Sequence, residues 1–219
     1  MPPCESRMRR TAFVVDGFNV YHSLRDAGRD LCGAGTRWLD LRSLCRSFLP
    51  QIHPTAQLSG VYYFSAFAAH LEPIKPGVTA RHLAYIECLS ATGVEAEMGH
   101  FKPKAIPCAS CGARTARHEE KETDVAIAVR LVELADGDTC DAVALVSGDS
   151  DLAPALRAVA RHSPHKPVYC FFPYGRGSLD LRALATRSFK IRKERYAAHQ
   201  LPDPVTLPSG HTIRRPVGW

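Results

Sequence analysis

Residues 143–156 read VALVSGDSDLAPAL, an apolar run that passes through an acidic turn into a helical pattern. The apolar residues within Asp141–Val146 have the length and branching of a buried strand. Asp149, Ser150 and Asp151 are all residue types that cap the start of a helix. A strand that leads through a short turn into a helix is the repeating unit of a parallel sheet, so this stretch predicts an α/β fold.

The same alternation extends on both sides of this stretch. Buried strands are predicted at Ala12–Val15, Ser59–Ser65, Val94–Phe101, Asp141–Val146 and Pro167–Phe172, with an edge strand at Phe189–Ile191. Helices are predicted at Asn19–Ala27, Leu39–Phe48, Val78–Ala91, Glu119–Ala135, Asp151–Arg161 and Leu179–Ala185. The pattern indicates a doubly wound, mainly parallel sheet of Rossmann type, with helices on both faces and the strand order 3-2-1-4-5. In the long helix, the buried stripe is predicted to be Val125, Ala128, Val129, Val132 and Ala135.

Composition narrows the class of protein. The 219 residues are 45% hydrophobic and 23% charged, which excludes a wholly disordered chain, a collagen-like fibre and a disulfide knot. No apolar run is long enough for a transmembrane helix, and the apolar stretch Thr11–Val15 is too short for a secretory signal. We therefore expect a cytoplasmic protein. The net charge of +6 favours an anionic partner, nucleic acid first.

Two segments depart from the alternating pattern. Residues 102–118 contain Pro103, Pro107 and a Cys pair, so they are predicted to form an irregular insertion within a domain of residues 11–192. Residues 193–219 are rich in proline and predict a tail or a small hairpin. The scattered cysteines, such as those at positions 45, 88 and 170, are interpreted as buried reduced thiols.

Four carboxylates follow or precede elements that meet at one edge of such a sheet. Asp16 comes directly after the first strand, and Asp149 and Asp151 follow the fourth. Asp124 begins the long helix that leads to the fourth strand. In the predicted order the first and fourth strands are neighbours at the point where α/β sheets bind ligands. Clustered carboxylates favour a hard cation such as Mg²⁺ or Mn²⁺. The alternative is a turn for Asp16, a helix cap for Asp149 or Asp151, and a partner of the helix dipole for Asp124.

Three blocks of the sequence resemble a known family. VVDGFNVYHSL (Val14–Leu24), EKETDVAIAV (Glu120–Val129) and VALVSGDSDLAPAL (Val143–Leu156) resemble, in this order, the conserved blocks of the NYN domain. The resemblance extends over roughly residues 11–192. It implies a PIN-like fold and a metal-dependent ribonuclease, although some members of this family have no established activity.

The resemblance also implies roles for individual residues. Asp16, Asp124, Asp149 and Asp151 match the carboxylates of the family's metal site. Asn19 matches an Asn expected to orient Asp16 or a metal-bound water, and Ser147 a hydroxyl that supports the carboxylates. Lys121 matches a Lys that contacts phosphate or balances the acidic charge; its alternative is a solvated surface lysine. Glu122 departs from the family, where Gly is frequent at this position, and leaves the start of the helix open.

A second metal site is suggested by CASCGA, residues 108–113. Cys108 and Cys111 provide half of a tetrahedral zinc site, and His118 and His100 are candidates for the other two ligands. The alternative is a pair of free thiols in a loop, because a single CxxC is weak evidence for zinc.

Basic and aromatic residues near the acidic positions indicate contacts to RNA. Tyr174 is a candidate for base stacking and Arg176 for a phosphate contact, in the loop after the fifth strand. Lys102 and Lys104 flank the insertion and extend the positive surface. The alternative for the loop is a solvated glycine-rich turn. RNA is the expected partner, no membrane partner is expected, and a homodimer is left open.

Three functions compete for this sequence. The leading interpretation is a ribonuclease that hydrolyses phosphodiester bonds at an acidic Mg²⁺ or Mn²⁺ site. A phosphatase related to haloacid dehalogenases is disfavoured because Phe18 and Ala153 stand where that chemistry needs acids. The third is a non-catalytic module that binds RNA or regulates another protein.

Overall fold

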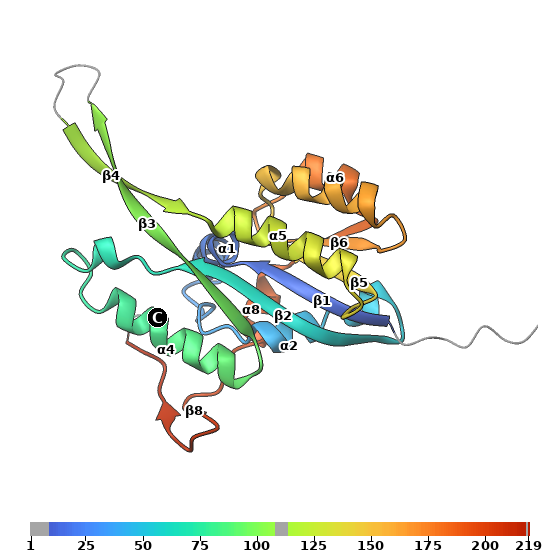
Figure 1. Ribbon diagram of the computed structural model, residues 1–219. Coiled ribbons are helices and arrows are strands. Elements are labelled where there is room, and N and C mark those ends of the chain that lie inside the picture. Colours follow the sequence, from blue (N-terminus) through green and yellow to red (C-terminus); the bar gives the residue numbers. More distant parts are fainter. Residues whose placement is uncertain (1–8, 108–113, 218) are drawn as a thin grey trace, which may run out of the picture.

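Seven strands form a single, mostly parallel sheet. The structure, a computed structural model, describes residues 9–107, 114–217 and 219. The strand order is β4-β3-β2-β1-β5-β6-β7, and only the pair β3 and β4 is antiparallel (Figure 1). The strands are β1 (Arg9–Asp16), β2 (Ala56–Ala66), β3 (Glu95–Pro107), β4 (Arg114–Lys121), β5 (Ala142–Val146), β6 (Val168–Phe172) and β7 (Arg187–Lys190). The predicted α/β class and the predicted order of the parallel strands are confirmed.

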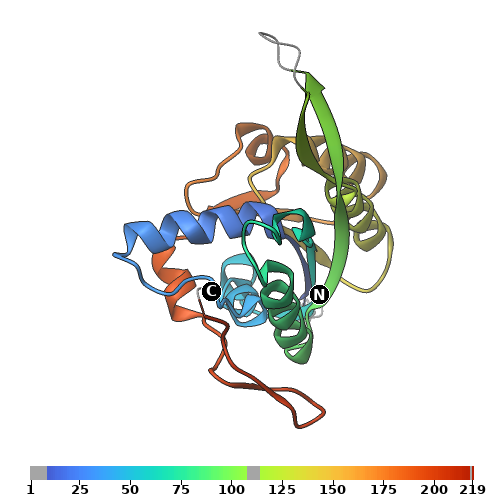
Figure 2. The same cartoon turned by 90° about the vertical axis from the view of Figure 1, so that its left-hand side faces the viewer.

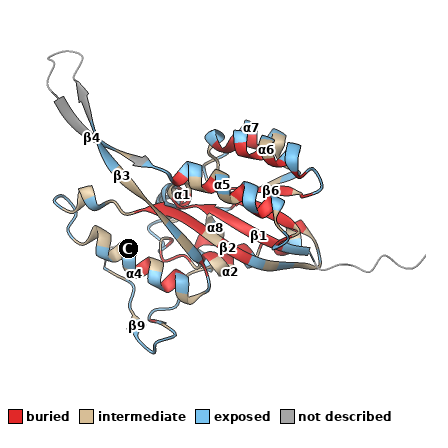
Figure 3. Cartoon of the chain, in the orientation of Figure 1, coloured by how far each residue is buried: buried red, intermediate tan, exposed pale blue. Residues whose placement is uncertain are grey.

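Helices cover both faces of this sheet, as Figures 1 and 2 show. One layer contains α1 (Gly17–Asp30), α2 (Leu41–Arg46), α3 (Leu49–Ile52), α4 (Val78–Ala91) and α8 (Lys193–Ala198). The other contains α5 (Thr123–Asp136), α6 (Ala153–His162) and α7 (Leu179–Leu184). Residues of β1 alternate between the two cores: Phe13 and Val15 pack against the first layer, Ala12 and Val14 against the second. β5 and β6 are therefore buried along their whole length, and β1 is buried from Thr11 to Asp16 (Figure 3).

The segment predicted to be an irregular insertion is largely a β-hairpin. Strands β3 and β4 pair antiparallel from His100 opposite Lys121 to Pro107 opposite Arg114, and the hairpin projects from the body of the molecule (Figures 1 and 2). The prolines misled the prediction because β3 pairs with β2 only as far as Gly99. Beyond that residue one side of β3 needs no ladder hydrogen bonds, and proline is compatible with such an edge.

Helix α5 presents a different face to the core than the valine pattern predicted. Its buried residues are Thr123, Ile127, Leu131, Leu134 and Ala135. Val125, Val129 and Val132 are instead exposed. The helix carries apolar residues on two stripes, and periodicity alone does not tell which of them meets the sheet.

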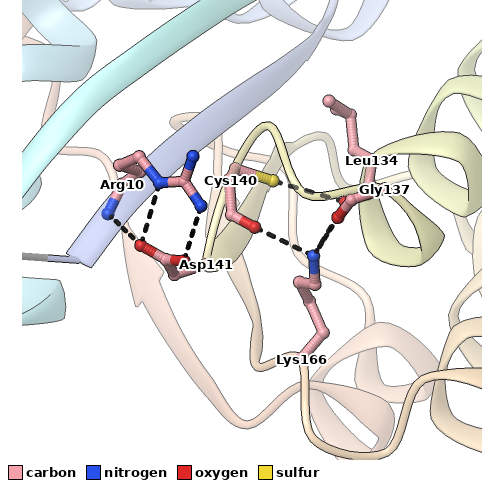
Figure 4. A network of polar contacts seen from close by, with 6 residues as sticks. All are labelled: Arg10, Leu134, Gly137, Cys140, Asp141 and Lys166. Carbon is pink, nitrogen blue, oxygen red and sulfur yellow. Dashed lines mark hydrogen bonds and ion pairs between the residues drawn. The ribbon is translucent and has the colours of Figure 1, made fainter.

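A buried lysine joins the end of α5 to the start of β5. Lys166 is 8% exposed, and its Nζ donates to the carbonyl oxygens of Leu134, Gly137 and Cys140 at 3.3, 2.5 and 2.9 Å (Figure 4). The ion pair between Arg10 and Asp141, at 2.9 Å, ties the start of β1 to the residue before β5 in the same view. These contacts lie at the amino ends of the two strands and hold their register relative to α5.

The remaining elements are short. They are the 3₁₀ turns η1 (Ala69–Leu71) and η2 (Ser150–Leu152) and the hairpin of β8 (Val205–Thr206) with β9 (Thr212–Ile213). Cys45, Cys88 and Cys170 are buried free thiols, as predicted. Within the described ranges, no helix combines the length and the apolar character needed to cross a membrane.

Candidate metal and RNA site

Asp16 ends β1 and caps α1. Its Oδ1 accepts a 2.9 Å hydrogen bond from the backbone N–H of Asn19, and its Oδ2 accepts one of 2.7 Å from the hydroxyl of Ser147. The residue is 4% exposed. Burial raises the pKa of Asp16 to about 6, the two hydrogen bonds oppose this change, and the charges of Asp124 and Asp149 add to it. The carboxylate is thus held in one orientation by two hydrogen bonds, and the charges that raise its pKa are those of other carboxylates.

The loop after β5 is fastened to the same carboxylate. The buried Ser147 hydroxyl, besides donating to Asp16, accepts a 3.0 Å hydrogen bond from the backbone N–H of Asp149. The side-chain Oδ1 of Asn19 accepts a 3.0 Å bond from the backbone N–H of Gly148. Asn19 therefore holds Asp16 through its backbone and the loop through its side chain. The Ser147 hydroxyl therefore bonds both the carboxylate of Asp16 and the backbone of Asp149.

Asp149 caps the turn that leads into α6. Its Oδ1 accepts a 3.0 Å hydrogen bond from the backbone N–H of Asp151. The capping role proposed as an alternative for Asp149 is therefore real, and Asp16, for which a turn was the alternative, caps a helix as well. It does not exclude a ligand role, because a carboxylate has about four lone-pair sites and each of these two caps uses one for its backbone N–H.

Asp124 lies in the first turn of α5 and faces the loop after β5. Partial desolvation, followed by the charges of Asp149 and Asp151, raises the pKa of Asp124. Since Asp16 is in turn influenced by Asp124 and Asp149, the four carboxylates are electrostatic neighbours at one edge of the sheet. The predicted convergence of β1, β5 and α5 at this edge is what brings them together.

A shallow groove between α5 and α6 opens beside these carboxylates. It has a volume of about 450 Å³, and Asp124 and Asp151 line it together with Ala155 and the exposed valines of α5. The valines of α5 that were predicted to be buried are therefore part of the surface next to the acidic residues. This apolar wall was not predicted from the sequence.

The donor set agrees with a hard cation, but it is not a closed cage. All four side chains offer oxygen, the ligand type that Mg²⁺ and Mn²⁺ prefer, and their mutual repulsion would be relieved by a cation. Among residues 9–107, 114–217 and 219, however, no group of three or more His, Cys, Asp or Glu side chains stands ready to hold a metal ion. Asp124 and Asp151 are exposed, so their side chains have room to change rotamer.

Glu122 occupies a strained position before α5. Its φ of 78° and ψ of −24° lie in the left-handed region, and α5 begins at the next residue. This backbone conformation explains why glycine suits the position and why Glu is a departure there. The Glu122 carboxylate lies 3.2 Å from Nδ1 of His100. The ammonium group of Lys121 lies 3.0 Å from the carboxylate of Glu119. Its charge therefore balances a carboxylate of β4 rather than those of the acidic site.

The two histidines proposed as zinc ligands do not come together. Cys108 and Cys111 lie outside the described residues. His100 is opposite Lys121 and His118 is opposite Pro103, so the two histidines are three rows apart on the hairpin and point to opposite faces. His118 stacks on His70 with ring centroids 4.3 Å apart, whereas His100 contacts Glu122. His100 and His118 therefore cannot ligate one ion together, and that part of the prediction is wrong.

Three of the four candidates for RNA contact already make local contacts. The hydroxyl of Tyr174 donates to Asp30 at 2.7 Å, and its ring is only partly exposed. Arg176 lies 3.6 Å from Asp26 of α1. On the hairpin, Lys104 contacts Glu119 at 2.6 Å and Lys102 is exposed. Tyr174 and Arg176 lie in the loop after β6, at the same sheet edge as the carboxylates, while both lysines lie on the hairpin.

Sequence reasoning assigned no role to Gly148. A Cβ at this position would lie 2.9 Å from the carbonyl oxygen of Arg176, closer than real Cβ contacts allow. The acidic loop therefore packs directly on the loop after β6, and only glycine permits that approach. The sequence shows a glycine between Ser147 and Asp149. It does not show that the backbone of Arg176 leaves no room for a Cβ at this position.

Comparisons with known proteins agree with this architecture. A comparison with curated proteins found no match. Among solved structures, a protein of unknown function from Vibrio parahaemolyticus is similar in fold: it is 20% identical, with a TM-score of 0.56 over 90% of this chain and 98% of its own. The model of the NYN domain matches residues 10–192. Because this match spans most of the chain and includes all four carboxylates, the chain belongs to the NYN domain family.

Proposed function

We propose that the chain is a metal-dependent ribonuclease that hydrolyses phosphodiester bonds in RNA. The observation that carries the proposal is the state of Asp16. It is buried at the carboxyl end of β1, its pKa is raised to about 6, and the charges of Asp124 and Asp149 contribute to that rise. Within an NYN domain, which is nuclease-like as a family, such a carboxylate is best explained as a ligand awaiting a cation.

In this proposal Asp16, Asp124, Asp149 and Asp151 hold Mg²⁺ or Mn²⁺. When bound, the metal supplies an activated water and stabilises the charge that develops on the phosphate. Ser147 and the backbone of Asn19 keep Asp16 in one orientation through bonds of 2.7 and 2.9 Å. The side chain of Asn19 keeps the Gly148 loop, and with it Asp149, at a fixed distance from β1.

RNA is the proposed substrate, and the chain is proposed to act in the cytoplasm. The net charge of +6 favours a polyanion despite the acidic site. Arg176 is proposed to contact phosphate, with Lys102 and Lys104 along the hairpin. Tyr174 is proposed to stack on a base with the exposed part of its ring. Its bond to Asp30 restricts the ring, which reduces the entropy lost on stacking.

A non-catalytic RNA-binding module is the second candidate, and one observation favours it. The described residues contain no preformed group of three metal-binding side chains. A chain that binds RNA without cleaving it needs no such group. The phosphatase alternative has no comparable support, since Phe18, at the position of its second acid, packs edge-on against Phe101.

Incubation of labelled single-stranded RNA with the purified chain tests the proposal. Cleavage is expected with Mn²⁺ or Mg²⁺ and is expected to stop when EDTA is added. Binding without cleavage under every metal condition would favour the non-catalytic module. Neither binding nor cleavage would reject both candidates.

A further inference from the structure

The loops after β6 and β7 enclose a pocket distinct from the acidic site. Its volume is about 680 Å³, within the range that holds a small-molecule ligand. One wall is Phe172–Leu179 and the other is Lys190–Glu194, with Arg182 of α7 between them. Because β6 and β7 run parallel to β5, the pocket opens at the same edge of the sheet as the four carboxylates.

The lining of this pocket is strongly cationic. It contains Arg176, Arg182, Lys190, Arg192 and Lys193 against a single carboxylate, Glu194. Arg176 lies near Asp26, and Lys193 donates to the carbonyl oxygen of Asp30 at 3.0 Å. In the described part of the chain, no carboxylate lies within 4.0 Å of the side-chain nitrogens of the other three.

Arg176 contributes a partly exposed guanidinium to this lining. Its Nε has no hydrogen-bond partner among the described residues but is buried, so a ligand in the pocket contacts the exposed part of the side chain. A partly exposed guanidinium in a pocket rich in positive charge is suited to a group that accepts several hydrogen bonds. Phosphate has this property, and its oxygens match the fork of an arginine.

We propose that this pocket binds a phosphate of the RNA strand at a position away from the bond that is cleaved. The inference rests on the proposed function, because it assigns the phosphate to the same substrate. The pocket lies two strand spacings from the acidic site, about 10 Å along the sheet edge. The packing of Gly148 on Arg176 joins the two sites, so a bound phosphate and the carboxylates keep a fixed separation.

Binding to labelled single-stranded RNA in EDTA, measured by fluorescence anisotropy at several salt concentrations, tests the pocket without cleavage. The variant R182Q/K190Q/R192Q removes three cations that have no carboxylate partner. The control K75Q/R157Q/R161Q removes three exposed cations that do not line the pocket. The net charge changes equally in both. We expect the pocket variant to bind about tenfold more weakly and to lose about 0.7 of salt slope for each phosphate released.

RNAs with a 5′-phosphate and with a 5′-hydroxyl distinguish the two sources of the phosphate. A preference for the 5′-phosphate that disappears in the pocket variant identifies a terminal group. Equal weakening for both RNAs identifies an internal phosphodiester. If the pocket variant and the control bind alike, with the same salt slope and unchanged melting temperatures, the pocket does not bind phosphate.

RNA binding and RNA cleavage test the phosphate pocket and the ribonuclease proposal separately. Reduced binding by the pocket variant, without cleavage by the wild type under any metal condition, retains the pocket and rejects the enzyme. Normal metal-dependent cleavage with unchanged binding by the pocket variant rejects the pocket alone.

Discussion

The hydroxyl of Ser147 donates a 2.7 Å hydrogen bond to Oδ2 of Asp16 and so joins the carboxyl ends of β5 and β1. Both residues are buried, and the bond crosses between neighbouring strands. The contact stabilises the charged form of Asp16, yet burial outweighs it and the pKa rises. A raised carboxyl pKa means that the folded chain binds a proton more readily than the unfolded chain.

The contribution of Asp16 to the stability of the metal-free chain should therefore fall as pH rises from about 4 to about 6. The contribution of Asp16 is fully present below its ordinary pKa of 3.8 and is lost as pH passes the folded value of about 6, at a cost of about 3 kcal/mol. Asp16→Asn removes this cost and retains a helix cap. We expect it to be about 2 kcal/mol more stable than wild type at pH 7.5, but not at pH 4. Urea unfolding at both pH values measures this difference; parallel pH profiles would contradict it.

Divalent metal should stabilise the wild-type chain. At a Mg²⁺ concentration a hundredfold above Kd, the stabilisation is about 2.7 kcal/mol, or roughly 5–10 °C in Tm for a chain of this length. Asp149→Asn, which removes one carboxylate, should lose most of this shift. Thermal unfolding followed by circular dichroism, with and without Mg²⁺, measures the effect. The same shift in both proteins would place the bound metal elsewhere.

Asp149→Asn should abolish cleavage but leave RNA binding equal to or tighter than that of wild type. The change removes a charge that the metal needs, and it also reduces repulsion of the phosphodiester. Cleavage and gel-shift assays on the same RNA separate the two effects. Asp138→Asn is the matched control, because Asp138 is exposed and precedes β5, at the opposite end of the strand. Wild-type cleavage by the Asp149 variant would exclude this site as the source of activity.

Gly148→Ala should damage both stability and cleavage. The new Cβ would stand 2.9 Å from the carbonyl oxygen of Arg176, and the shift needed to relieve this would strain the bond to Asn19. We expect a loss of about 1–3 kcal/mol in unfolding free energy. Gly177→Ala is the control, since a Cβ at Gly177 meets nothing within 4 Å. Equal behaviour of the two variants in unfolding and cleavage would show that the close approach is unimportant.

Glu122→Gly should stabilise the chain by about 1 kcal/mol, because Glu122 holds a left-handed backbone that glycine adopts without strain. Glu122→Ala removes the same exposed contact to His100 but keeps the strain, and it should not be stabilising. Urea unfolding of the two variants compares them directly. If Glu122→Ala were stabilising and Glu122→Gly were not, the Glu122 side chain, rather than the left-handed backbone, would be the source of the destabilisation.

The sequence predicted the parts of the fold that depend on alternation and chain order. Short apolar strands and intervening helices are sufficient to place Asp16 and Asp149 at neighbouring strand ends. Single-element periodicity was insufficient for α5, where Ile127 and Leu131 rather than Val125 and Val129 meet the core. The choice between two apolar stripes is made by the sheet, and it is not encoded in the helix alone.

Other features depend on contacts between distant segments. The cationic pocket combines residues of two loops and a helix, which the sequence displays only as scattered charge. The prediction that His100 and His118 share one zinc ion failed for a similar reason, since strand register directs them to opposite faces. The role of Lys166 could not be predicted either, because it depends on three carbonyl groups that come together only in the folded chain.

The two edge strands of the sheet have a consequence for the behaviour of the concentrated protein. β7 has only four residues and carries Arg187 and Lys190 at its ends, and β4 carries Glu119 and Lys121. Shortness in β7 and charged side chains in both strands make them poor templates for the addition of a further strand. β7 and β4 are thereby disfavoured as sites of edge-to-edge aggregation, and the exposed valines of α5 are an apolar surface at which self-association is favoured instead.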